Sequence, residues 1–188
     1  MNNRYIKKIK KSLDTKGLDI MIPAAGLGKR MKSHGPKSLI SIKYGQRILD
    51  RQVSLIDDYF IAESPTNAIK VENELYENTN VARSIGLGLR AIPSSDRLLL
   101  INGDLVFTNN MIGAMSYDCS CIFVSDKFMG DGEVGCIINK KGYLENLMYD
   151  LPVKWCQIAY FQGKELEELR NIACQRKNKK LFTSEIIN

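Results

Sequence analysis

The spacing of hydrophobic residues changes from one segment of the chain to the next, and these changes mark the expected secondary structure. Continuous apolar runs predict buried strands, whereas apolar residues three or four positions apart predict helices. The expected strands lie at residues 18–23, 68–72, 97–102, 120–124 and 153–161, and the expected helices at 46–60, 80–92 and 163–175. Residues 132–150 predict a β-hairpin with Lys140, Lys141 and Gly142 in its turn. One face of the 46–60 helix is expected to hold Ile48, Leu49, Gln52, Val53, Ile56 and Phe60.

The order of these elements predicts the fold class. Buried strands alternate with helices and are followed by a hairpin-rich half, which is typical of α/β proteins. We expect one domain at residues 18–188, folded as a three-layer α/β/α sandwich with a mainly parallel central sheet. A basic helical extension is expected at residues 1–17, where apolar residues have helical spacing.

Composition narrows the classes of function. The chain has 188 residues, enough for a sizeable core, and a formal net charge of +6. Much of the excess positive charge lies near the two ends, without the interleaved aromatic residues of a single-strand binding surface. We therefore expect no nucleic-acid partner.

Several features favour the cytoplasm. No apolar run approaches the roughly 18 residues of a membrane span, and the N-terminal segment lacks the apolar region of a signal peptide. The five cysteines are odd in number, and none of their spacings is typical of a zinc site or a redox pair. Reduced thiols, no membrane contact and a cytoplasmic location are the expectation.

Candidate chemistry follows the first expected strand, in the stretch IMIPAAGLGKRMKSHGPKSLI at residues 20–40. Gly26 and Gly28 allow a tight turn whose backbone N–H groups can face an anion. Lys29, Arg30 and Lys37 add full positive charge, which suits a triphosphate. His34 is expected to be a solvated loop residue.

Two common glycine motifs are excluded. The GxxxxGK[ST] pattern of a P-loop is absent, and Met31 stands where a dinucleotide fingerprint needs a third glycine. A second polar group, Asn102 to Asp104, follows the strand at 97–102. Because ligands of such sheets bind at the carboxyl ends of strands, we expect this group and residues 24–30 to line one pocket.

The string PAAGLGKRMKSHGPKSLI resembles the signature of nucleotidyltransferases that join NTPs to sugar phosphates or phosphocholine. The string LLLINGDLVF resembles the metal-binding motif of that family, and NELYENTNVARSIGLGL resembles the segment between the two motifs. The resemblance covers about residues 18–125. It implies a Rossmann-like nucleotidyltransferase fold and Mg²⁺-dependent transfer of a nucleotidyl group from an NTP to a phosphorylated small molecule, with release of pyrophosphate.

The resemblance also implies roles for individual residues. Arg30 and Lys37 would be catalytic, and Asp104 would bind Mg²⁺. The nucleotide would be held by Ala24, Ala25, Gly26, Leu27, Gly28, Lys29, Asn80 and Ser84. The acceptor would lie under residues 129–135, with Asp131 and Glu133 as polar candidates and with Tyr149, Trp155 and Tyr160 as sources of cation–π contacts.

Two departures from the family pattern leave alternatives open. Only residues 61–67 stand where the family has an additional βα unit, and no candidate for a second metal-binding aspartate follows Asp150. A molybdopterin-type guanylyltransferase has a similar glycine loop, and a nucleotide-binding remnant without turnover would also fit. The sequence leaves the base, the acceptor and the oligomeric state open.

Overall fold

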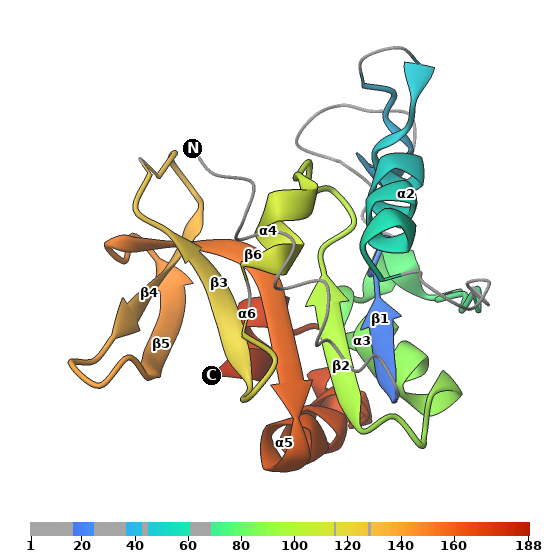
Figure 1. Ribbon diagram of the computed structural model, residues 1–188. Coiled ribbons are helices and arrows are strands. Elements are labelled where there is room, and N and C mark those ends of the chain that lie inside the picture. The colour runs from blue at the N-terminus through green and yellow to red at the C-terminus, as the bar shows by residue number, and fades with distance from the viewer. Residues whose placement is uncertain (1–16, 25–36, 43–44, 61–68, 115, 128) are drawn as a thin grey trace.

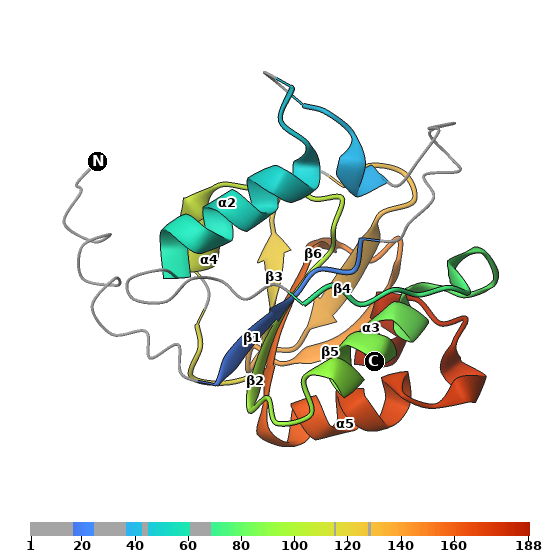
Figure 2. The same ribbon diagram turned by 90° about the vertical axis from the view of Figure 1, so that its right-hand side faces the viewer.

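A six-stranded sheet with helices on both faces forms the centre of the computed structural model (Figures 1 and 2). The structure describes residues 17–24, 37–42, 45–60, 69–114, 116–127 and 129–188. The strands are β1 (Leu18–Met21), β2 (Arg97–Ile101), β3 (Cys121–Ser125), β4 (Val134–Ile138), β5 (Leu144–Tyr149) and β6 (Val153–Gln162). The helices are α2 (Ile48–Phe60), α3 (Val81–Ala91), α4 (Asn109–Gly113), α5 (Gly163–Ala173) and α6 (Thr183–Ile187), with short 3₁₀ turns η2 (Lys37–Leu39), η4 (Tyr76–Asn78) and η5 (Arg176–Asn178).

The layers follow from the alternation of side chains along β2. Leu98 and Leu100 face one layer, formed by α3, α5 and α6, whereas Leu99 and Ile101 face the other, formed by α2 and α4. All four leucine and isoleucine side chains are buried, which is why β2 is a continuous apolar run rather than an alternating one. The three-layer α/β class is confirmed.

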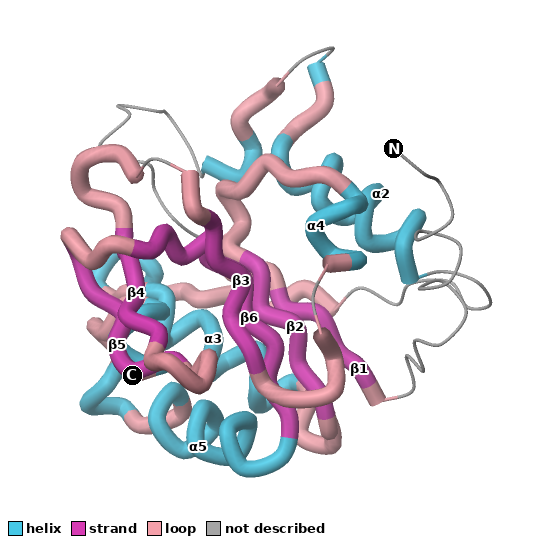
Figure 3. The backbone as a smooth tube through the Cα atoms, turned by 60° about the vertical axis from the view of Figure 1, so that its left-hand side comes forward, coloured by secondary structure: helices cyan, strands magenta, loops and turns pink. Residues whose placement is uncertain are grey.

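Strand β6 organises the sheet. It pairs with β3 along one edge, and on the other edge it pairs antiparallel with β2 at 158–162 and with β4 at 153–154. Strands β3, β6 and β2 lie side by side in Figure 3. The ends of β2 and β4 are therefore separated along a single edge of β6. The β6 residues between the two paired stretches have no strand partner on that edge.

Within the confirmed class, the sheet is mixed rather than mainly parallel. The pair β1–β2 is parallel, and every other pair among the described strands is antiparallel. The reason is the return of β6 from the hairpin, which brings it back antiparallel to β2 instead of through a crossover helix.

The strand predicted at 68–72 is wrong for the residues that the structure describes there. Residues 69–73 have no strand geometry, and Ile69 and Val71 are exposed. The side chains of Lys70 and Glu72 are also exposed, and they pair with each other at 2.6 Å. The helical extension at 1–17 and the shortened segment 61–67 lie outside the described residues, except for Gly17.

The remaining expected elements are confirmed to within a few residues, including the hairpin β4–β5, in which Gly142 has φ +85°. Gly86 in α3 is explained by close packing, because a Cβ there would come within 2.3 Å of the Ala173 carbonyl oxygen at the end of α5. None of the described helices is both long enough and apolar enough to cross a membrane.

Candidate functional site

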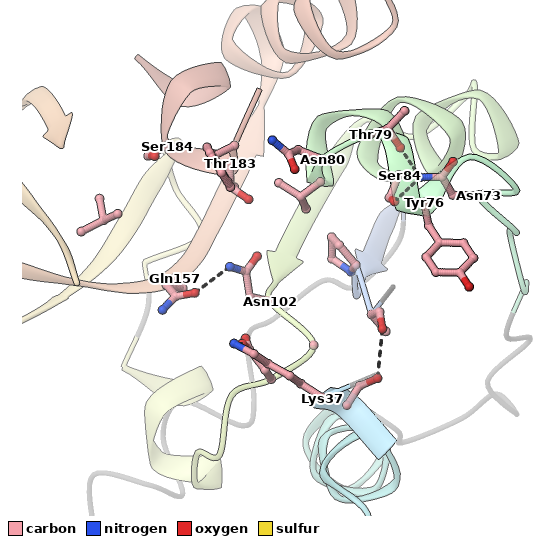
Figure 4. A pocket seen from close by; sticks show the side chains of 18 of the residues that line it. Lys37, Asn73, Tyr76, Thr79, Asn80, Ser84, Asn102, Gln157, Thr183 and Ser184 are labelled. Carbon is pink, nitrogen blue, oxygen red and sulfur yellow. Dashed lines mark hydrogen bonds and ion pairs between the residues drawn. The ribbon is translucent and has the colours of Figure 1, made fainter. Parts of the chain in front are cut away.

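A cavity of about 510 Å³ opens at the carboxyl ends of β1 and β2 (Figure 4). Its floor is formed by the ends of these strands and by η2. One wall comes from residues 73–84, and the opposite wall comes from β4, β5, β6 and the beginning of α6. Segments from both ends of the chain thus meet around one space.

The floor brings a cation and an anion together. Lys37 Nζ lies 3.2 Å from Asp104 Oδ2, and each side chain is about one-third exposed, at 33% and 37%. Ser38, which is buried, donates a hydrogen bond of 3.1 Å to the Ala24 carbonyl oxygen. Ala24, Lys37 and Asp104 therefore share the cavity, as expected, whereas residues 25–30, including Arg30, lie outside the described residues.

The ends of β1 and β2 approach each other closely at Gly103. A Cβ at this position would come within 2.8 Å of the Pro23 carbonyl oxygen and 2.9 Å of the Ala24 Cα atom. The Gly103 N–H also donates to that Pro23 oxygen at 3.1 Å. Glycine is required here for the two strand ends to place their functional groups side by side.

We use the name Asp104 loop for residues 102–105, which are held from two further directions. From α2, the buried Gln52 donates hydrogen bonds of 2.9 Å to the carbonyl oxygens of Asn102 and Leu105. From β6, Gln157 accepts a hydrogen bond of 2.7 Å from Asn102 Nδ2, and its carbonyl oxygen accepts from the Asn102 N–H (Figure 4).

Gln157 has an unusual backbone. Its φ is +60°, in the left-handed region that residues other than glycine rarely adopt. It lies between the stretch of β6 that pairs with β2 and the stretch that pairs with β4, so the left-handed residue marks an irregularity in the strand. Non-glycine residues with such strain concentrate at functional sites.

The wall formed by residues 73–84 is organised by Asn73. Its Nδ2 atom donates to Thr79 Oγ1 and to Ser84 Oγ, both at 3.1 Å, and its Oδ1 atom accepts from the Leu75 N–H (Figure 4). Asn80 lines the cavity as expected, but its side-chain amide also donates to the Lys180 carbonyl oxygen. Ser84 is placed in the cavity by the first turns of α3.

On the opposite wall, the side chain of Glu133 is engaged by its own neighbours. Lys154 Nζ lies 2.6 Å and 2.7 Å from its two carboxylate oxygens, and the Gly130 N–H donates to it at 2.8 Å. The hydrogen bond from Lys154, reinforced by that from Gly130, holds the pKa of Glu133 below its ordinary value. Glu133 lines the cavity, whereas Asp131 is exposed and is not part of the lining.

Of the three aromatic residues considered for the acceptor, two reach the cavity. Tyr149 is half exposed, and Trp155 is buried with its Nε1–H donating to the Ile158 carbonyl oxygen. The expectation for Tyr160 is wrong, because this side chain is fully buried beneath α2 and α4. There it packs edge-on against Tyr117 and donates to Gln162.

The described residues contain no group of three or more His, Cys, Asp or Glu side chains that could hold a metal ion by themselves. The described carboxylates that line the cavity are those of Glu77, Asp104 and Glu133. Of these, Asp104 lies on the floor, where it faces the ammonium group of Lys37.

Comparison with solved structures decides the fold. Over 90% of its length the chain superposes on CTP:phosphocholine cytidylyltransferase from Streptococcus pneumoniae, with a TM-score of 0.71, 15% identity and 83% of that chain covered. The inositol-1-phosphate CTP transferase from T. maritima gives a TM-score of 0.71 over 90% of this chain and 79% of that chain, at 14% identity. The chain has the nucleotidyltransferase fold.

A third neighbour extends the comparison to sugars. UDP-glucose pyrophosphorylase in complex with UDP-glucose matches 89% of this chain and 84% of its own, with a TM-score of 0.58 and 15% identity. No family model matches the sequence, and no curated protein matches it significantly. The likeness to nucleotidyltransferases noted in the sequence is thus confirmed at the level of the fold.

Several cavity residues of this nucleotidyltransferase fold were missed by sequence reasoning. They are Asn73, Gln157, Thr183 and Ser184 in the lining and Gln52 behind it. Gln52 had a detectable signal, since it is a polar residue on the apolar face of an amphipathic helix. Thr183 and Ser184 had none, because α6 is a five-residue helix whose place beside the cavity depends on long-range packing.

Proposed function

We propose that the protein transfers a nucleotidyl group from an NTP to a phosphorylated small molecule and releases pyrophosphate. The supporting observation is the meeting of Lys37 and Asp104 on the floor of one cavity, between two walls of different composition. The nucleotidyltransferase fold places this cavity at the strand ends, where ligands of α/β sheets bind.

The proposed reaction is a substitution at phosphorus. A phosphate oxygen of the acceptor forms a bond to the α-phosphorus of the NTP while the bond from that phosphorus to the bridging β-phosphate oxygen breaks. The electron pair of the broken bond leaves with pyrophosphate. Because the attacking phosphate is already anionic at neutral pH, the step needs no general base. The protein must instead hold two anions in line and stabilise the charge that develops.

Lys37 and Arg30 are the proposed sources of that stabilisation. Lys37 has a flexible side chain, and its ammonium group would move from Asp104 to the α-phosphate and the incoming phosphate. Arg30 would bind the leaving pyrophosphate through two N–H groups. Residues 24–29, with Asn80 and Ser84, would hold the nucleotide on the same side.

Mg²⁺ fits the residues present. This ion is bound in many phosphoryl-transfer sites by one or two carboxylates together with substrate phosphates, and Asp104 supplies one carboxylate at the cavity floor. When bound there, Mg²⁺ would shield the negative charge of the phosphates. Asp104 would hold it against the phosphates of the nucleotide.

The acceptor would lie along the wall of β4, β5 and β6. A sugar 1-phosphate and a phosphocholine-like molecule are the two classes considered, since hydroxyl groups could bind the polar side chains and a quaternary ammonium could stack on Tyr149 and Trp155. We also propose a cytoplasmic location, which is supported by the five cysteines being free.

The test is pyrophosphate release from each of the four NTPs, with a panel of sugar 1-phosphates, phosphocholine and a molybdopterin as acceptors. We expect release that requires both an NTP and an acceptor, and that is lost in Asp104→Asn but retained in Asp126→Asn, a matched change at an exposed aspartate outside the cavity. Release only with GTP and the pterin would favour the guanylyltransferase alternative. Nucleotide binding without release would identify a remnant that has lost turnover.

A further inference from the structure

The buried polar side chains of the described residues are concentrated around the cavity. They are Ser38, Gln52, Thr183 and Ser184, and all but Gln52 line the cavity itself. Gln52 lies one layer behind, on α2, with only 1% of its surface exposed. Because Gln52 is not part of the cavity lining, the question is what a buried amide does there.

The hydrogen bonds of Gln52 are all directed at the Asp104 loop. Its Nε2 atom donates to the Asn102 and Leu105 carbonyl oxygens at 2.9 Å each, so one amide group grips the residues on both sides of Gly103 and Asp104. No other described side chain bridges the two ends of the loop in this way. The amide of Gln52 therefore holds both ends of the loop that carries the Asp104 carboxylate.

A glutamine at this buried position also has an unfavourable side. The Oε1 atom of Gln52 is buried and has no hydrogen-bond partner among the described residues. The other buried side-chain oxygen without a partner among the described residues is Asn102 Oδ1, which belongs to the Asp104 loop. An unpaired buried oxygen is unfavourable, and an apolar residue of similar length would avoid it on the otherwise apolar face of α2. Two donated hydrogen bonds offset this cost, and both are made to the Asp104 loop, which points to a role for the donor.

We propose that Gln52 is a positioning residue, which holds the Asp104 loop so that the carboxylate faces the metal and the phosphates of the reaction proposed above. Gln157 supports the loop from β6 and Gly103 fastens it to β1, but only Gln52 reaches both of its ends. That Gln52 holds the loop is inferred from the hydrogen bonds alone. That this affects the reaction rests on the proposed function.

The test compares Gln52→Met with Arg170→Met. Methionine is close to glutamine in size and removes both the donor and the unpaired oxygen. Arg170 is a matched control, because its guanidinium also grips backbone carbonyl oxygens, those of Leu89, Ile92 and Ser95. Those residues lie at the end of α3 and in the turn before β2, away from the cavity.

The first measurement is hydrogen exchange of the amides of residues 102–105, three of which make hydrogen bonds in the structure. Measured relative to global unfolding, we expect exchange of the loop at least about tenfold faster in Gln52→Met, because the two lost hydrogen bonds hold this loop. In Arg170→Met we expect lower thermal stability. Once this lower global stability is taken into account, the exchange rate of the Asp104 loop should be unchanged. Unchanged loop exchange in Gln52→Met would overturn the proposal whether or not the protein has any turnover.

The second measurement is the Mg²⁺ concentration that gives half-maximal turnover. We expect it to rise about 10- to 100-fold in Gln52→Met, the range typical for residues that orient metal ligands, with KM for the NTP changed much less. If Gln52→Met does not fold, Gln52→Glu keeps the shape and places a carboxylate oxygen against the two carbonyl oxygens, so the same shift is expected. Equal changes in the half-maximal Mg²⁺ concentration and in KM for the NTP would contradict a positioning role. Absence of turnover in the unmodified protein would refute the proposed function while leaving the exchange result to decide on Gln52.

Discussion

At the scale of the residue, Lys37 has two partners in the proposed reaction, one in the free protein and one in the complex. Without substrates it neutralises Asp104, and with substrates it would neutralise phosphate oxygens instead. An exposed ion pair of this kind contributes little to stability, so its value lies in keeping two reactive groups in one place before the ligands arrive.

We predict that Lys37→Ala lowers turnover by about 10²- to 10³-fold, because a stabiliser of developing charge typically contributes that much. The midpoint of thermal unfolding should hardly change. Lys70→Ala is the matched control, since it removes a lysine from an exposed ion pair outside the cavity. The same loss of turnover is expected for Arg30→Ala. Unchanged turnover in a folded variant would remove that residue from the mechanism.

The left-handed backbone of Gln157 permits a prediction about stability. Both Gln157→Ala and Gln157→Gly lose the hydrogen bond with Asn102, but only glycine adopts a φ of +60° without strain. We expect the free energy of unfolding to be greater for the glycine variant than for the alanine variant by about 1 kcal/mol, measured by urea denaturation. Equal values would show that the backbone relaxes when the side chain is lost.

At the scale of the element, the sequence predicts strands and helices well where burial repeats with a clear period. Strand β2 is buried on both faces and α3 has one apolar face, so each pattern is unambiguous. The error at 68–72 arose because an alternation of apolar and charged residues also occurs in a segment whose described residues, 69–72, belong to no strand. Strand directions were beyond reach, because the return of β6 between β2 and β3 depends on contacts far apart in the chain.

The ion pair of Glu133 and Lys154 joins the beginning of β4 to β6 and gives a prediction for pH. The lowered pKa of Glu133 means that its ionised form stabilises the fold. This contribution is complete above the ordinary glutamate pKa of about 4.3 and is lost as the pH falls through the lowered value. We expect Glu133→Gln to be less stable than the unmodified protein at pH 7, and the gap in thermal midpoint to close as the pH falls below about 4. A gap that stays constant would mean that the charge of Glu133 is not involved.

At the scale of the whole molecule, the cavity lies between two sides that differ in how well the sequence predicts them. The motif strings predict the floor and the nucleotide side, because glycine, lysine and aspartate near strand ends carry a clear chemical signal. The opposite wall has no such signal, and the lining residues expected there are limited to three from the predicted loop 129–135, namely Gly132, Glu133 and Val134, together with Tyr149 and Trp155. Gln157 and the hydroxyl groups of α6 come from segments whose position depends on the complete sheet.

The separation of the two walls predicts a separation in kinetics. Glu133→Gln should raise KM for the acceptor and leave KM for the NTP nearly unchanged, since the triphosphate would be held on the other side. Lys154→Met is the informative partner, because it breaks the same ion pair and keeps the carboxylate of Glu133. A rise in acceptor KM in both variants would indicate that the pair shapes the wall, whereas a rise in Glu133→Gln alone would indicate direct contact with the acceptor. An unchanged acceptor KM in Glu133→Gln would leave this loop without a role in acceptor binding.

The most direct test of nucleotidyl transfer is ³¹P nuclear magnetic resonance of the protein mixed with Mg²⁺, an acceptor and the NTP that supports pyrophosphate release. We predict two new products in equal amounts, pyrophosphate and a diphosphate ester that joins the nucleotide α-phosphorus to the acceptor phosphate. Neither product should form with Asp104→Asn. Formation of inorganic phosphate and NDP, or of pyrophosphate with free NMP and unchanged acceptor, would show hydrolysis and contradict nucleotidyl transfer.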